Sequence, residues 1–152
     1  MINCTFKLND KPMSAFKLGA PSFPAFSGLK GHVNRRSSVC IPGFGPIPLG
    51  KYHIFDRQSG GLFGPFRDLF TDRDEWFALY AIDGKIDDET YCEKVKRGLF
   101  RLHPKGPLGV SKGCIVINGW SDFQSVKALL KKTEKEIISE VGLESYGTVT
   151  VK

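Results

Sequence analysis

Residues 102–117 read LHPKGPLGVSKGCIVI, two short apolar segments joined by a loop rich in Gly and Pro. His103 ends the first segment, and Cys114, preceded by Gly, opens the second. Short apolar runs bounded by turn residues predict strands, so we expect strands over 98–103 and 114–117. If these two strands pair, the loop brings His103 and Cys114 close together.

The pattern around this stretch also favours strands. We expect them over 3–8, 51–55, 76–82 and 147–152, which are either alternating or continuously apolar. A single helix is expected near residues 121–140. Ser121 and Gln124 form its capping box, apolar residues recur at helical spacing, and Gly142 is its stop. The predicted fold class is therefore mainly β (α+β), with one substantial helix.

Length and composition limit the class of protein. The chain of 152 residues is 41% hydrophobic and 25% charged, which predicts one globular domain over 1–152 and excludes a disordered chain. We expect residues 1–20 to be either an N-terminal delivery segment or an edge strand. The longest apolar run, 76–82, is far shorter than the ~20 residues of a membrane-spanning helix, so no membrane span is expected.

The charge is unevenly distributed. Residues 1–60 contain eight Lys or Arg and two acids, which accounts for the whole net charge of +6. Such a region favours an anionic partner. Because no RNA- or DNA-binding motif accompanies it, we do not expect nucleic acid as that partner.

The four cysteines do not form a recognisable metal site. Cys4, Cys40, Cys92 and Cys114 lack the paired spacing of zinc ligands, and we expect neither a metal nor a cofactor. One pair among Cys4, Cys40 and Cys92 could form a disulfide in an oxidising compartment, and the sequence does not say which.

A thiol nucleophile requires a base within hydrogen-bonding reach. We therefore predict Cys114 as the nucleophile and His103 as its base, with a thiol pKa lowered by the imidazole. Gly113 allows close backbone approach, and the amides around it could form an oxyanion hole. Ser111 and Lys112 complete this candidate oxyanion loop.

Three further residues are candidates for substrate binding: Arg101, Tyr52 and Trp76. Arg101 shares a strand face with His103 and could bind a substrate carboxylate through its planar guanidinium. The structural alternative is that Cys114, before an Ile-Val-Ile run, is only a small buried hydrophobic residue.

Five sequence blocks, two of which overlap, carry a family resemblance. Ser111–Ile115 resembles the Ser-His-Gly-Cys signature of L,D-transpeptidases, and Pro46–Ile54 resembles a strand of the same fold. Together with Phe23–Gly28, Gly45–Pro48 and His103–Gly106, they resemble the type VI secretion L,D-transpeptidase effectors. These antibacterial toxins, the Tlde family, are related to YkuD-type L,D-transpeptidases.

The resemblance implies an L,D-transpeptidase-like β-sandwich that acts on peptidoglycan. Cys114 would attack the carbonyl of meso-diaminopimelate in a tetrapeptide stem and expel the terminal D-Ala, while His103 would take the thiol proton. Water as acceptor would give L,D-carboxypeptidase activity, and a D-amino acid would give exchange.

The same resemblance implies a cognate immunity protein and a type VI secretion carrier as partners. The protein would be made in the cytoplasm without a Sec signal and would act in the target-cell periplasm. A backbone carbonyl just after His103 would orient the imidazole, as in the wider family. Lys112 stands where the family signature has His, and Val116 where related enzymes often have Arg.

Two other functions remain as alternatives. A papain-like or NlpC-type cysteine peptidase of the cell wall would have to use Cys40 with His53 or His103, because its Cys precedes its His. A non-catalytic cell-wall binding module would not require Cys114 at all.

Overall fold

The computed structural model describes residues 1–57, 76–106, 109 and 111–152. In these residues strands predominate and a single α-helix occurs, which confirms the mainly β class. The elements are β1 (Ile2–Phe6), β2 (Ser14–Leu18), β3 (Ser22–Phe26), η1 (Lys30–His32), η2 (Arg36–Ser38), β4 (Gly50–Asp56), β5 (Phe77–Ala81), β6 (Glu89–Cys92), β7 (Val95–Gly98), β8 (Arg101–Pro104), β9 (Ile115–Ile117), α1 (Trp120–Lys132), β10 (Glu136–Ile138) and β11 (Leu143–Val151).

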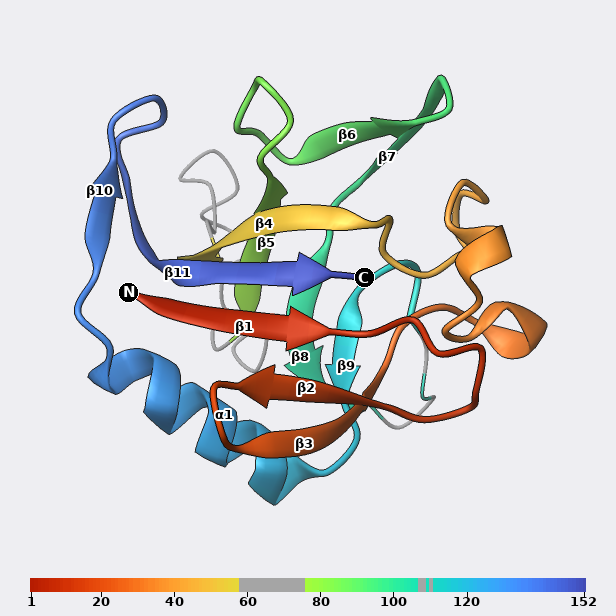
Figure 1. Ribbon diagram of the computed structural model, residues 1–152, viewed down its shortest axis with the longest axis horizontal. Coiled ribbons are helices and arrows are strands. Elements are labelled where there is room, and N and C mark those ends of the chain that lie inside the picture. The colour runs from red at the N-terminus through yellow and green to blue at the C-terminus, as the bar shows by residue number, and fades with distance from the viewer. Residues whose placement is uncertain (58–75, 107–108, 110) are drawn as a thin grey trace, which may run out of the picture.

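The main sheet closes on itself. Its strand order is β1-β2-β3-β9-β8-β5-β4-β11-β10, and β1 also pairs with β11 (Figure 1). Within the described residues, eight strands thus form a barrel, and β10 is attached outside it. The expected L,D-transpeptidase-like sandwich is corrected accordingly. The sheet closes into a barrel because β1 and β11, at the two ends of the chain, pair in parallel. This pairing joins what would otherwise be two exposed sheet edges.

The N-terminal segment is part of this closure. β1 is hydrogen-bonded to β2 on one side and to β11 on the other, so it is not an edge strand. Gly147 allows the close approach, because its φ is +146° and a Cβ there would lie 1.9 Å from the Ile2 oxygen. Four strands of the charge-rich region 1–60, β1 to β4, are therefore part of the barrel.

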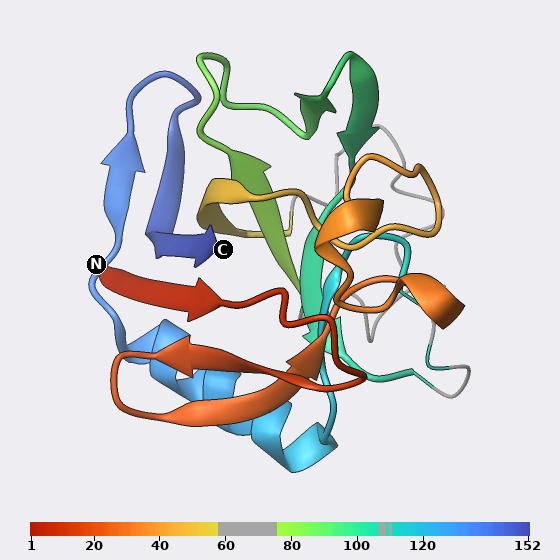
Figure 2. The ribbon, with the colours of Figure 1, turned by 45° about the vertical axis from the view of Figure 1, so that its right-hand side comes forward.

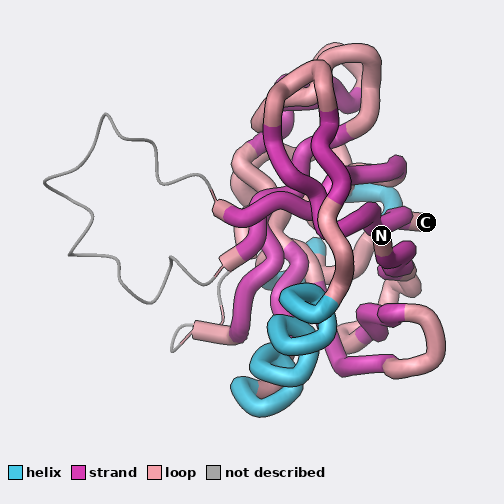
Figure 3. Tube along the Cα trace, turned by 90° about the vertical axis from the view of Figure 1, so that its left-hand side faces the viewer, coloured by secondary structure: helices cyan, strands magenta, loops and turns pink. Residues whose placement is uncertain are grey.

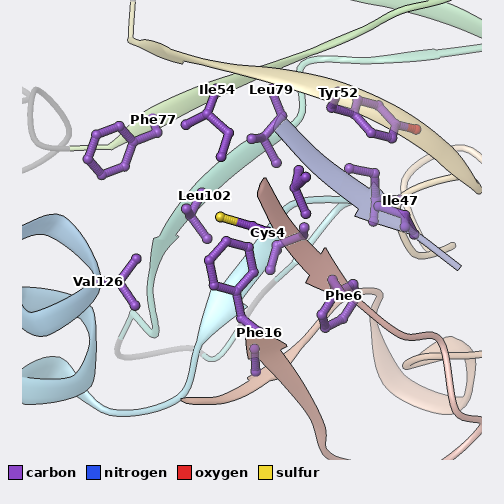
Figure 4. Close-up of a cluster of buried hydrophobic side chains, with 14 of the residues drawn as sticks. Cys4, Phe6, Phe16, Ile47, Tyr52, Ile54, Phe77, Leu79, Leu102 and Val126 are labelled. Atoms are coloured by element: carbon purple, nitrogen blue, oxygen red, sulfur yellow. The ribbon is translucent and has the colours of Figure 1, made fainter. Parts of the chain in front are cut away.

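The barrel interior is an apolar core (Figure 4). Alternate residues of the strands point into it, as the two-residue period of a strand requires. Fully or almost fully buried members include Cys4, Phe6, Phe16, Ile47, Tyr52, Ile54, Phe77, Leu79, Leu102 and Val126.

The helix is shorter than expected. It ends at Lys132 rather than near 140, because the chain after it becomes extended and forms β10 against β11. Its N-cap is Gly119, so Ser121 does not cap it, and Gly142 lies in the turn between β10 and β11. The helix lies beside the strands in Figures 1 and 3, and Phe123, Val126 and Leu130 of its inner face enter the core. No helix of the described part is long and apolar enough to cross a membrane.

The strand expected over 98–103 is interrupted. β7 ends at Gly98 and β8 starts at Arg101, with Leu99 between them at φ +59°. β6 and β7 consequently form a separate two-stranded hairpin outside the barrel (Figure 2). A disulfide between Cys40 and Cys92 joins this hairpin to the segment after η2.

Candidate active site

The candidate site is formed on two adjacent strands, β8 and β9. They pair in parallel, with Leu102 opposite Ile115 and His103 opposite Val116. Leu102 and Ile115 face the core. Side chains alternate along a strand, so His103 and Cys114 project from the opposite, outward face. The expected pairing of the two segments is therefore present, with Cys114 directly before β9.

His103 is held by two contacts. Its Nδ1 lies 2.7 Å from the carbonyl oxygen of Pro104, and its ring stacks on Trp76 with centroids 4.1 Å apart and planes 18° apart. A carbonyl only accepts hydrogen bonds, so this contact requires a proton on Nδ1. In the neutral ring Nε2 is then the basic nitrogen. The carbonyl expected after His103 is thus that of Pro104.

Cys114 is half-buried and free of disulfides. Its sulfur lies 3.8 Å from the Leu99 oxygen. Burial raises the pKa of the Cys114 thiol, and the backbone N–H of Arg101 and the positive charges of Arg101 and Arg57 only partly offset this effect. The lowered pKa expected from the sequence is therefore wrong for this state. The thiol keeps its proton until a base removes it.

Arg101 does not present an open guanidinium to a substrate. Its two terminal nitrogens donate to the two carboxylate oxygens of Asp88, at 2.8 and 2.6 Å. This bidentate pair occupies the geometry that a substrate carboxylate would need. The cation that sequence reasoning missed is Arg57, which lies 5.6 Å from the Trp76 ring centroid and contributes positive potential at Cys114.

The loop residues before Cys114 have different roles. The buried hydroxyl of Ser111 donates to the Cys114 carbonyl at 2.7 Å and accepts from the Gly28 N–H at 3.1 Å. Gly113 has φ +108°, a conformation that favours glycine. Lys112 is exposed. Ser111 and Gly113 therefore fix the backbone conformation at Cys114.

Two of the sequence blocks noted above, Phe23–Gly28 and Gly45–Pro48, provide hydrogen bonds that support this loop. Ser27 accepts from the Ile47 N–H at 2.9 Å through its hydroxyl, and its own N–H donates to the Asn34 side chain at 2.9 Å. Gly28, next to it, has φ +100° and bonds Ser111. These motif residues are thus a buried scaffold for the Cys114 loop.

Tyr52 is not part of the site. Its ring is buried in the core and its hydroxyl donates to the Pro48 oxygen at 2.7 Å.

His53 is a buried histidine outside the site. Burial lowers the pKa of its imidazole, whose Nδ1 has no hydrogen-bond partner among the described residues. The described part of the chain contains no group of three or more His, Cys, Asp or Glu that could hold a metal ion.

A groove of about 650 Å³ borders the segment after His103. Four cations line it, and Asp10 is the acid among its described lining residues. We call it the basic groove, and its cations are Lys11, Lys30, Arg35 and Lys105. Most of these cations come from the first third of the chain, where the sequence concentrates the net charge.

Comparison with known proteins gives one match. The family model described as the Tlde1 domain matches residues 21–141, which include Cys114, His103 and the residues described above as contacting them. No curated protein and no solved structure matches the chain significantly. Because the family model covers most of the chain, this protein belongs to the Tlde1 domain family of type VI secretion effectors.

Proposed function

We propose that this effector is a cysteine-dependent L,D-carboxypeptidase or exchange enzyme acting on peptidoglycan tetrapeptide stems. The observation that carries the proposal is the fixed tautomer of His103. Its Nδ1–H donates to the Pro104 oxygen, which leaves Nε2 basic on the face that also bears Cys114. A raised thiol pKa makes such a base necessary, since Cys114 would not ionise on its own near neutral pH.

The proposed reaction has two steps. Nε2 of His103 takes the thiol proton, and the sulfur attacks the carbonyl carbon of meso-diaminopimelate. The C–N bond to D-Ala breaks, the imidazolium protonates the leaving amine, and a thioester remains on Cys114. In the second step water, or the amine of another D-amino acid, attacks the thioester. His103 accepts the proton of this acceptor and the thiol is regenerated.

The surroundings of the site fit an anionic substrate. A tetrapeptide stem carries several carboxylates, and Arg57 and the cations of the basic groove supply positive potential near Cys114 and beside the segment after His103. We further propose action in the target-cell periplasm, with a secretion carrier and an immunity protein as partners.

The alternatives make different predictions. The papain-like alternative requires a free Cys40 thiol, and Cys40 is bonded to Cys92. The binding-module alternative predicts that Cys114 and His103 are dispensable. The experiment below is designed to distinguish this alternative from the proposed enzyme.

The test is mass spectrometry of a disaccharide-tetrapeptide incubated with the protein, with and without D-Met. We expect loss of one alanine, or its replacement by methionine. Cys114→Ala and His103→Ala should abolish both products while the folded state persists. His32→Ala is the matched histidine control, since its Nδ1 bonds the Ser38 hydroxyl, outside the site. An unchanged tetrapeptide with folded wild-type protein, or full activity of Cys114→Ala, would overturn the proposal.

A further inference from the structure

Arg97 is a buried cation outside the catalytic pair. It lies on β7 and is 4% exposed. Its guanidinium donates to three main-chain oxygens, those of Val39, Gly45 (3.0 Å) and Pro46 (3.2 Å). Buried arginines ordinarily pair with a carboxylate. No ion pair among the described residues includes Arg97, so its hydrogen bonds serve to hold the segment 39–46 in place.

The same guanidinium lies against the backbone that precedes Cys114. A Cβ added to Gly113 would lie 2.7 Å from the Nη2 atom of Arg97 and 2.9 Å from the Phe100 ring. The guanidinium carbon is itself 5.5 Å from the centroid of that ring. Gly113 is thus confined between a cation and an aromatic ring, with its φ held at +108°.

A disulfide joins the same two segments a short distance away. Cys40 directly follows Val39, and Cys92 ends β6, which pairs with β7. The hairpin is therefore fastened to the segment 39–46 at two points, once covalently and once through Arg97. Of these two points, Arg97 is the one that lies directly against Gly113.

We propose that Arg97 is a positioning residue for Cys114, acting through Gly113. By holding the segment 39–46 and the β6–β7 hairpin together, it fixes the amides of Gly113 and Cys114 for the developing oxyanion. The Cys40–Cys92 disulfide supports the same arrangement, so its loss weakens catalysis as well. The inference rests on the proposed function for its kinetic consequence and on the geometry alone for its effect on Cys114.

The kinetic test compares Arg97→Gln and Arg97→Lys with wild type in release of D-Ala from the tetrapeptide. We expect kcat to fall by about 10²-fold in Arg97→Gln, with KM within about twofold, because a misplaced nucleophile or oxyanion donor costs about this much. Arg97→Lys should recover only part of the loss, since lysine lacks the planar fork. The matched control is Arg36→Lys, at an exposed position outside the basic groove, which should leave kcat unchanged.

The second readout does not depend on the reaction. The rate of alkylation of Cys114 is measured against pH in folded wild type, both Arg97 variants and the double variant Cys40→Ser/Cys92→Ser. A loosened loop should expose the thiol, giving faster alkylation and a midpoint shifted to lower pH. Should Arg97→Gln fail to fold by circular dichroism, Arg97→Lys and the double variant carry the test.

The outcomes separate the two proposals. If wild type releases no D-Ala but alkylation changes as expected, the proposed function fails and the positioning role stands. If the Arg97 variants and the double variant fold and retain the wild-type alkylation profile and kcat, the positioning role is refuted. A fall in kcat that Arg36→Lys reproduces also refutes it.

Discussion

Replacement of Asp88 by Asn tests how the half-buried cation beside Cys114 is held. Asp88 binds both terminal nitrogens of Arg101, at 2.8 and 2.6 Å, and the side chains of Arg101 and Asp88 are only 16% and 25% exposed. Asn preserves the shape but removes the charge and one acceptor. A hydrogen bond to a charged group contributes about 1.5–3 kcal/mol. We therefore expect the free energy of unfolding to fall by about 2 kcal/mol.

The assay is urea unfolding of wild type, Asp88→Asn, Arg101→Gln and the double variant. The double-mutant cycle should give a coupling energy above about 1 kcal/mol, and the Tm of Asp88→Asn should fall by about 4–8 °C. The matched control is Asp87→Asn, whose 3.5 Å pair with the exposed Lys85 should contribute less than about 0.5 kcal/mol.

The same substitution has a consequence at the nucleophile. The negative charge of Asp88 raises the pKa of the Cys114 thiol, whereas the guanidinium of Arg101 lowers it. Removal of the carboxylate should therefore lower this pKa and speed alkylation of Cys114 at fixed pH. A stability loss no larger than that of Asp87→Asn, or an unchanged or slower alkylation rate, would refute the reasoning.

Three further predictions follow from the core and the surface. Leu102→Ala, in the barrel interior, should destabilise the protein by about 2–5 kcal/mol in urea unfolding. A loss below about 1 kcal/mol would show that the core around Leu102 is not closely packed. Burial raises the pKa of Cys4 from 9.0 to about 12. The contribution of the protonated Cys4 thiol to the free energy of unfolding should therefore be complete below pH 9 and should decline by about 1.4 kcal/mol per pH unit above it. Cys4→Ala should lack this component of the alkaline decline, and an identical decline in both proteins would contradict it. In a sedimentation assay with peptidoglycan sacculi, the double variant Lys11→Glu/Lys105→Glu should bind more weakly than wild type at low salt and equally at high salt. Equal binding at low salt would exclude the basic groove as a binding surface for peptidoglycan.

The sequence was sufficient for the local features of the site. The apolar period predicted the strand that carries His103 and the strand that begins directly after Cys114, and the turn residues between them marked the loop. The spacing of Phe123, Val126 and Leu130 predicted the inner face of the helix. These features depend on neighbours a few residues apart, which a sequence pattern can express.

The sequence could not show contacts between distant segments. The bidentate partner of Arg101 is Asp88, thirteen positions away, and nothing in the spacing marks this pair. Arg57 lies two positions after the expected strand 51–55, and its contact with Trp76 joins two segments that no local pattern connects. The helix was predicted too long, since the register of β10 against β11 overrides the local helical pattern after Lys132.

The residue types and spacing thus determined the mainly β class, the inner face of the helix and the two side chains proposed for catalysis. Tertiary structure decided that the sheet closes, because the parallel pairing of β1 with β11 joins the two ends of the chain. It also decided the direction in which the pKa of the Cys114 thiol shifts, since the burial that raises this pKa exists only in the folded chain. Closure and desolvation arise from the packing of the whole chain, and no local pattern encodes them.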